Sequence, residues 1–444
     1  MTTWKYFQIV MICAAGRVTP RFILHVSSKP EFNRLLSVVP QRRYVPSRLE
    51  NVENVEEYRP GGFHSISIGD VLAKGRYKFL HKLGFKGSST VWFACDQCPQ
   101  QPPALPAILG PLMALRVLSA ELSSEPKKSE IAELALPILL AAFLRVSDTP
   151  VCHHVQVVED HFMEEGPNGI HLCLVYPFAG LSVRSMSDSR GRVPGSRRLL
   201  ADLAKKVAKQ TATAVDLFHS AGLVHGGLSY SGVRVVHPPY VWQIHSLFGT
   251  DLTTSNILFI ISEQLHELDD STIHWTLGNK PVTNEVRTCN GTLAETHGAP
   301  RELVEPVDMA RLSTSLLLQK NVVVIDLGQS FATGHFPKDY ESATTIHYVS
   351  PEARFESIIS PASDTWGLAC AIFEIRVGSP LFEPFLGNSQ DILKQTVHTL
   401  GKLLEPWWNT FENRELWFEE NGETKPKKVQ EREGVLLTSS ASSI

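Results

Sequence analysis

The residues of this chain best suited to chemistry are Asp251, Asn256 and Asp326, and the segment that carries the first two is interrupted. The sequence reads Leu-Val-His-Gly at 223–226, continues through 227–250, and resumes as Asp-Leu-Thr-Thr-Ser-Asn at 251–256. With 227–250 removed, the pattern is H-x-D-x-x-x-x-N. Aspartate and asparagine are residue types that serve in proton transfer and metal binding. The rejoined segment is therefore the first candidate for a reactive site.

A Gly-rich segment precedes it in the sequence. This segment could cover a phosphate group only if it forms a β-hairpin. Residues 83–92 read Leu-Gly-Phe-Lys-Gly-Ser-Ser-Thr-Val-Trp and follow a strand-like run at 76–80. Small residues at a hairpin tip let backbone N–H groups lie close to phosphates, which bulky side chains would obstruct. The segment predicts either a phosphate-covering hairpin or an ordinary Gly-rich turn.

Two apolar strands are also expected, each with one notable charge. The run at 113–118 has Arg116 as its only cation, and the run at 322–328 ends in Asp326 and Gly328. Taken singly, these residues fit a solvated strand edge and a turn after a strand. The fifth motif is a Ser-Pro-Glu string at 350–352 followed by an Asp-x-Trp string at 364–366, the latter at the expected start of a helix. The order of the five motifs is stronger evidence than any one of them.

In this order the five motifs resemble those of the protein kinases. The strings Ser-Thr-Val-Trp at 89–92 and His-Leu-Cys-Leu-Val-Tyr at 171–176 make the chain similar to the SR-protein kinase family, particularly its fungal members. The resemblance covers roughly residues 60–420. It implies an α+β, bilobal protein kinase fold with a small β-rich lobe at 61–178, a larger and mostly helical lobe at 179–420, and a spacer at 262–320.

The resemblance also implies a serine/threonine kinase that uses ATP and Mg²⁺ and acts on protein substrates, with Ser/Arg-rich segments favoured. Asp251 would orient the substrate hydroxyl and accept its proton, and Asn256 and Asp326 would bind the metal ions. Arg116 would occupy the position of the phosphate-gripping lysine, with Glu133 as its helix partner. The residues implied in nucleotide binding are Leu83, Gly84, Lys86, Gly87, Ser89, Val91, Ala114, Arg116 and Tyr176, the last at the segment that joins the lobes.

Several residues depart from the kinase pattern. Arg116 keeps the positive charge of the usual lysine, but its planar guanidinium does not reproduce the shape of a compact lysine ammonium. Lys86 replaces a loop glycine, and Pro137 falls inside the expected helix, so we do not expect a firm Arg116–Glu133 pair. Two functions stay open: an active kinase, and a pseudokinase that binds ATP or protein as a scaffold.

The residue before the expected catalytic aspartate is Gly226, or Thr250 in the chain as written. Kinases that are switched by phosphorylation generally have an arginine there, which pairs with the phosphate. Neither residue can form that pair. We therefore expect activity that does not depend on phosphorylation of Thr344 or Thr345, as in the family that the chain resembles.

Two runs look foreign to the kinase pattern. Residues 227–250 hold one charged residue, Arg234, among many apolar ones, whereas a surface loop is normally polar. Residues 97–112 carry no charge and are rich in proline. The first run is interpreted as translated non-coding sequence, with an adaptive loop as the alternative, and the second is open to the same interpretation.

Composition limits the class of protein. A formal net charge of −4 argues against a direct nucleic-acid partner, and no segment is apolar over the length that spans a membrane. Seven cysteines favour a reducing compartment, and zinc at the single C-x-x-C pair, Cys95 and Cys98, is the weaker interpretation. We expect a monomer in the cytoplasm or nucleus. A basic, disordered leader at 1–60 leaves mitochondrial import open, and a disordered tail is expected at 421–444.

Overall fold

The computed structural model describes residues 42–98, 112–124, 131–146, 153–189, 197–226, 252–277, 281–292, 294, 298–314, 317–333, 346–383 and 388–426. Contacts divide the chain into two units, 1–43 and 44–444, and the elements below belong to the second. The run at 227–250, most of 97–112, and Asp251, Thr344 and Thr345 lie outside the described residues.

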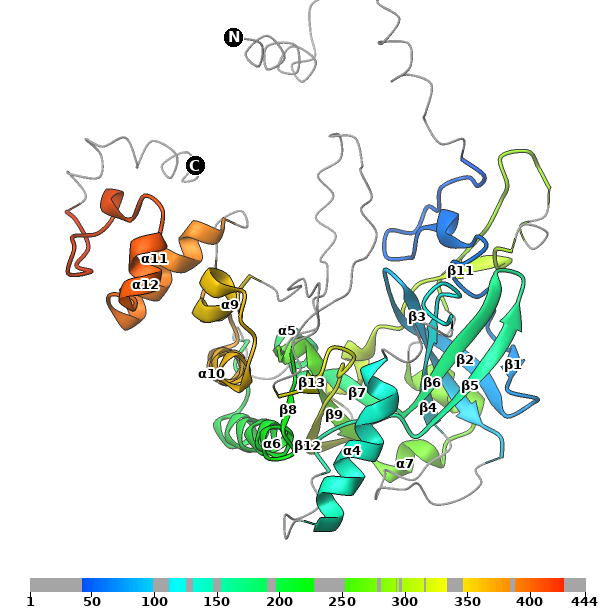
Figure 1. The fold of residues 1–444 in the computed structure, drawn as a ribbon. Helices are drawn as coiled ribbons and strands as arrows, with labels where there is room; N and C mark the ends of the chain where they lie inside the picture. The colour runs from blue at the N-terminus through cyan, green and yellow to red at the C-terminus, as the bar shows by residue number, and fades with distance from the viewer. Residues whose placement is uncertain are drawn as a thin grey trace, which may run out of the picture. The chain divides into compact units, whose positions relative to one another are not determined.

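An antiparallel sheet of six strands forms the small lobe (Figure 1). In the order β1-β2-β3-β4-β6-β5, the strands span Val71–Leu72, Tyr77–Lys86, Ser89–Asp96, Leu112–Leu118, Gly169–Pro177 and Asp160–Gly166. Alternate side chains, among them Phe79, Trp92 and Leu115, bury one face of the sheet. The hairpin predicted at 83–92 and the strand predicted at 113–118 are confirmed as β2–β3 and β4.

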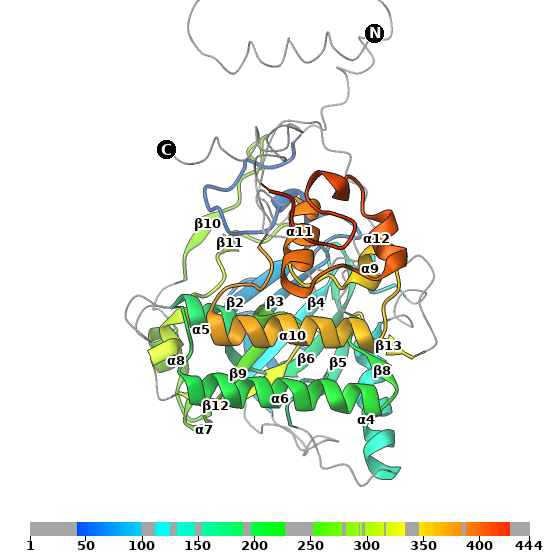
Figure 2. The ribbon, with the colours of Figure 1, turned by 90° about the vertical axis from the view of Figure 1, so that its left-hand side faces the viewer.

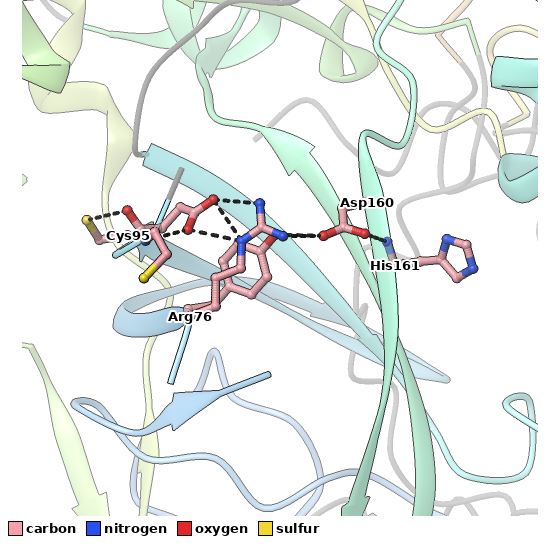
Figure 3. A network of polar contacts seen from close by, with 7 residues as sticks. Arg76, Cys95, Asp160 and His161 are labelled. Atoms are coloured by element: carbon pink, nitrogen blue, oxygen red, sulfur yellow. Dashed lines mark hydrogen bonds and ion pairs between the residues drawn. The ribbon is translucent and has the colours of Figure 1, made fainter. Parts of the chain in front are cut away.

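A polar network joins strands β2, β3 and β5 (Figure 3). Arg76 donates from Nη2 to Asp96 at 2.8 Å and from Nη1 to Asp160 at 2.7 Å, and Asp160 also accepts from the Tyr77 hydroxyl. Asp96 in turn accepts the backbone N–H of Cys98. Among the described residues, no group of three or more His, Cys, Asp or Glu side chains could hold a metal ion.

Two long helices, α6 at Ala201–Ser220 and α10 at Pro361–Val377, lie side by side in the large lobe (Figure 2). Strands β12, β9 and β7, at Leu318–Val324, Ile257–Ile261 and Ala179–Ser182, form a sheet in that order, and β12 packs on α6. Strands β8 and β13 pair Leu223–Val224 with Phe331–Ala332. Shorter helices are α5 at Val183–Asp188, α9 at Pro351–Glu356, α11 at Ser389–Leu400 and α12 at Glu405–Thr410.

The limits of α10 are encoded locally. Ser360 is its N-cap and forms a capping box with Ser363, while Pro361 takes the first turn, where its missing N–H costs nothing. Gly378 ends the helix at φ 84°, a left-handed conformation that favours glycine. This helix matters for the site because Asp364 lies in its first turn.

The sequence predicts a disordered leader up to residue 60, but residues 44–63, here named the N-terminal arm, are folded. The arm contains a 3₁₀ helix at Val55–Glu57. Tyr44 and Tyr58 are buried in a cluster that includes Val286 and Leu303. The expectation failed because these partners are more than 200 positions away in the sequence.

The spacer expected at 262–320 is largely folded in its described part. It contains α7 at Glu263–His266, α8 at Asp270–Thr276, strands β10 and β11 at Thr283–Glu285 and Glu302–Val304, and a 3₁₀ helix at Met309–Thr314. Leu265, Ile273 and Leu312 are buried in the same core as Phe259 of β9. Part of the spacer is therefore core and not surface loop.

The C-terminal end is more complete than the sequence analysis expected. Trp408, Phe411 and Phe418 form a buried aromatic cluster, and Lys425 donates its backbone N–H to Trp417. The described residues thus continue to 426, past the expected start of the tail at 421. The α+β fold with a β-rich part and a helical part is confirmed. No described helix has the length and hydropathy to cross a membrane.

Candidate active site

The Gly-rich hairpin turns at Gly87-Ser88 between β2 and β3. Gly84 pairs with Val91, and Lys86 pairs with Ser89 across the hairpin. A Cβ atom built at Gly84 or Gly87 would meet no atom within 4 Å. The hairpin tip is therefore open, as a segment that covers a phosphate group must be. Leu83 and Ala114 are partly buried against the main core, and Val91 is half-buried.

Arg116 and Glu133 form an ion pair, contrary to the expectation from Pro137. Arg116 Nη1 lies 2.6 Å from Glu133 Oε1, and Arg116 Nε donates to Ser89 Oγ at 3.2 Å. Burial opposes the charge of the guanidinium, but Glu133 and Tyr176 outweigh it and raise the pKa of Arg116. Arg116 thus holds the strand-to-helix contact that the kinase lysine normally makes.

Helix α4, at Ala132–Val146, runs through Pro137. A proline in a helix interior costs about 3 kcal/mol, because it removes one hydrogen bond and clashes with the preceding turn. Leu136 and Leu140 are buried against Leu217 and Phe218, and burying one such leucine contributes about 2 kcal/mol. Packing on both sides of Pro137 therefore offsets its cost, which explains why the sequence-based expectation was wrong.

Tyr176 pairs with Ala114 near the end of strand β6, which is followed by β7 of the large-lobe sheet after a single residue. Its place at the segment that joins the lobes stays a prediction. Its phenol interacts with Arg116, and burial, followed by the charge of Glu133, raises the pKa of Tyr176. The phenol therefore stays protonated, and its oxygen accepts from the Arg116 guanidinium, which has donors only.

The two predicted metal ligands in the described part of the chain lie next to each other. Asn256 ends a 3₁₀ helix at Thr254–Asn256, and its carbonyl accepts the N–H of Ile325 at 3.0 Å, one residue before Asp326. Asp326 has φ 66°, a conformation that costs energy in a non-glycine residue and is common at functional sites. Its Oδ2 pairs with the Nζ of Lys86. Carboxylate and amide oxygens are the kind of ligand that Mg²⁺ prefers, so Asn256 and Asp326 would hold Mg²⁺, in competition with the Lys86 ammonium.

Gly328 fixes the spacing between this segment and α4. A Cβ atom at position 328 would lie 2.5 Å from Glu133 Oε1. Only glycine therefore lets the Glu133 carboxylate keep its place beside Arg116. The structure thus brings Arg116, Glu133, Asp326 and Lys86 together around one hairpin tip, whereas Asp251 lies outside the described residues.

Asp364 is a site residue whose role the sequence analysis missed. Its carboxylate accepts the backbone N–H groups of His225 at 2.7 Å and Gly226 at 3.2 Å, and also contacts His219 Nε2 at 3.1 Å. It therefore fixes the chain just before the interruption. The Asp-x-Trp motif was the available signal, but only the fold shows which amides the carboxylate meets.

Sequence comparisons agree with this geometry, although no family model matches the chain. The chain is 24% identical over 381 residues to the serine/threonine-protein kinase SRPK of Physarum polycephalum, a match that covers 84% of this chain and 78% of that protein. It is 26% identical over 390 residues to the protein kinase dsk1 of Schizosaccharomyces pombe, covering 76% and 67% of the two chains. The human SRSF protein kinase 3 is 32% identical over 134 residues, 30% of this chain and 20% of that protein.

The chain is similar to the SR-protein kinases over most of its length. This relationship confirms the bilobal kinase fold and the interpretation as a serine/threonine kinase by resemblance. As an SR-protein kinase relative, the chain uses a small-lobe sheet to carry Arg116 and a large-lobe strand end to carry Asp326. The interpretation of 227–250 as non-coding sequence stays a hypothesis.

Proposed function

We propose that the chain is a serine/threonine protein kinase that transfers the γ-phosphate of ATP to hydroxyl groups of Ser/Arg-rich proteins. The observation that carries this proposal is the Arg116–Glu133 ion pair, formed at 2.6 Å and set against the Asp326–Gly328 segment. A kinase needs its strand cation, helix glutamate and metal-binding aspartate in place together. A scaffold with no use for phosphate would not need that arrangement.

The proposed roles follow from charge and position, because phosphoryl transfer depends mainly on positioning and on neutralising phosphate charge. Arg116 in β4 and Lys86 at the hairpin tip would neutralise the charge of phosphate oxygens. Asp251 would orient the attacking hydroxyl and accept its proton. Asn256 and Asp326 would hold Mg²⁺, which supplies further charge neutralisation when bound. Leu83, Val91 and Ala114 would contact the adenine.

The substrate class is proposed from the relatives. The human relative is named an SRSF protein kinase, and the slime-mould relative is named SRPK. We propose Ser/Arg-rich protein segments as substrates, no direct nucleic-acid or membrane partner, a monomeric enzyme, and a location in the cytoplasm or nucleus. Gly226 cannot pair with a phosphate, so we also propose that activity does not need phosphorylation of Thr344 or Thr345.

The proposal is tested by phosphate transfer from labelled ATP to a peptide of alternating arginine and serine. The matched control is Asp326→Ala, which removes one electrostatic stabiliser and should lower the rate by about 10² or more. Equal signals from the two proteins would overturn the kinase proposal. ATP binding is measured in parallel, so that loss of chemistry is separated from loss of nucleotide.

A pseudokinase is the second candidate, and one contact favours it. Lys86 pairs with the carboxylate expected to bind Mg²⁺, and Arg116 stands where kinases use lysine. Under this alternative the chain binds ATP, or a protein partner, without turnover. ATP binding together with transfer no faster than that of the Asp326→Ala variant would favour the scaffold.

A further inference from the structure

The tip of the β2–β3 hairpin contacts the segment that carries Asp326. Lys86 is the last residue of β2, and its Nζ pairs with Asp326 Oδ2 although the two residues are 240 positions apart. The Asp326 side chain is 9% exposed, while that of Lys86 is 33% exposed. The carboxylate is thus largely enclosed, and Lys86 is the more exposed member of the pair.

Arg116, the other cation of the site, already has hydrogen-bond partners. Arg116 donates from Nη1 to Glu133 and from Nε to Ser89, and its phenol neighbour is Tyr176. A planar guanidinium that is fixed on one side cannot turn its remaining donors as an ammonium can. Lys86 is therefore the cation better able to follow a phosphate group at the hairpin tip.

We propose that the Lys86 ammonium is a built-in counter-cation of Asp326, so that this chain binds nucleotide triphosphate without a divalent metal ion. The inference rests on the proposed function for the identity of the ligand, ATP, and extends it to how the ligand is held. A metal ion normally separates the aspartate from the phosphates, because two anions in contact repel each other. Here a side chain performs that separation.

The chemistry of an ammonium suits this role. It carries three N–H donors, of which one satisfies Asp326 and two can donate to phosphate oxygens. Such hydrogen bonds between charged groups are about twice as strong as neutral ones. Mg²⁺ must compete with the ammonium for the same carboxylate oxygen, so it adds little to nucleotide affinity and reaches Asp326 only at raised concentration.

The test compares ATP binding to the full chain by titration calorimetry in EDTA and in excess Mg²⁺. We expect the wild-type Kd to differ by less than about threefold between the two buffers. Lys86→Met should lose about tenfold or more in EDTA, the loss of one charge-assisted contact, and should recover affinity with Mg²⁺. Lys74→Met, an exposed lysine in the turn before β2, is the matched control and should change neither value.

The outcomes separate this inference from the proposed function. Wild-type binding that requires Mg²⁺ overturns the inference and leaves ATP as the ligand. No binding in either buffer overturns both. A Lys86→Met protein that binds ATP in EDTA as tightly as wild type also overturns the inference. The wild-type comparison needs no variant, so it stands even if Lys86→Met fails to fold.

Discussion

Gly328 is the residue on which the geometry of the Arg116–Glu133 pair depends most directly. In Gly328→Ala, the new Cβ would lie 2.5 Å from Glu133 Oε1, so the carboxylate must leave Arg116 or the backbone must move. We expect the free energy of unfolding to fall by about 1–3 kcal/mol and ATP affinity to fall with it. Denaturant unfolding and ATP titration measure the two effects.

Gly87→Ala is the control for that experiment, because its Cβ would meet no atom within 4 Å. It should stay within about 0.5 kcal/mol of wild type, as surface changes usually do. If both alanine variants lose the same stability, contact with Glu133 is not the cause.

Glu159 makes the stability of the folded protein depend on pH. Burial raises the pKa of Glu159 from 4.5 to about 7, and its Oε1 has no hydrogen-bond partner in the described part of the chain. Between these pH values the folded state keeps a proton that the unfolded state has lost, so stability falls as pH rises from 4.5 to 7. Glu159→Gln should remove about 2 kcal/mol of that decline.

The measurement is the free energy of unfolding of wild type and Glu159→Gln at pH 4.5, 5.5, 6.5 and 7.5. The difference between the two proteins isolates Glu159 from the buried histidines, which titrate in both. A constant difference across the series would show that Glu159 keeps an ordinary pKa.

At the scale of single residues, the sequence predicted which side chains carry charge in the site but not which of them meet. Arg116, Glu133 and Asp326 were identified because their strands and helix have clear local patterns. The contact of Lys86 with Asp326 and the position of the Tyr176 phenol were not, because both depend on how the hairpin and β6 sit against other elements. Local pattern carries no information about such distances.

At the scale of elements, the N-terminal arm is tied to the small-lobe sheet by a buried ion pair. Lys82 of β2 pairs with Glu53 of the arm, and both side chains are at most 2% exposed. Tyr58 donates its hydroxyl to the same carboxylate, and the Lys82 ammonium lies 5.6 Å from the centre of the Trp92 ring. The arm therefore covers the Lys82 ammonium and supplies the carboxylate that this buried charge needs.

Removing one member of this pair should be costly. In Glu53→Gln, the Lys82 ammonium stays buried without a carboxylate, and we expect the free energy of unfolding to fall by about 3–5 kcal/mol. Denaturant titration measures the loss. The double variant Glu53→Gln/Lys82→Met should recover most of it, since it leaves no charge uncompensated. A double variant as unstable as the single one would mean that the unpaired Lys82 charge is not the cause of the loss.

Elements with a local signal were predicted well, and elements held by distant contacts were not. The β2–β3 hairpin, strand β4 and helix α10 follow from alternation, glycines and caps in their own sequence. The arm was assigned to the leader because the residues before it are basic and because its buried partners, Val286 and Leu303, lie far along the chain. Helix α4 was underestimated for the same reason, since Leu217 and Phe218 cover it from another element.

At the scale of the whole molecule, the described residues on the two sides of the 227–250 run contact the same helix, α10. Asp364 of α10 holds Gly226, and Leu252 packs against Gly367 of the same helix. A variant that lacks 227–250 joins Gly226 to Asp251 and removes a loop whose closure costs about 3 kcal/mol. We expect it to fold with undiminished stability and to transfer phosphate at least about tenfold faster, since the rejoined segment has the H-x-D-x-x-x-x-N spacing of a kinase catalytic loop.

Thermal unfolding and labelled-phosphate transfer, each compared with the full chain, measure these two effects. A shortened chain that does not fold would contradict the interpretation of 227–250 as foreign sequence and favour an adaptive loop. Equal transfer rates would mean that the run does not disturb Asp251.

Because α10 contacts the Gly226 backbone through Asp364 and the Leu252 side chain at Gly367, we expect the fold to tolerate a break in the peptide chain between these two positions. The two flanking pieces interlock: β7 lies beside β9, β8 beside β13, and α6 beside α10. Residues 44–226 and 252–426 produced as separate polypeptides in one cell should therefore assemble and purify together through a tag on either one. The protein would then be a kinase fold in two parts, reconstituted by complementation.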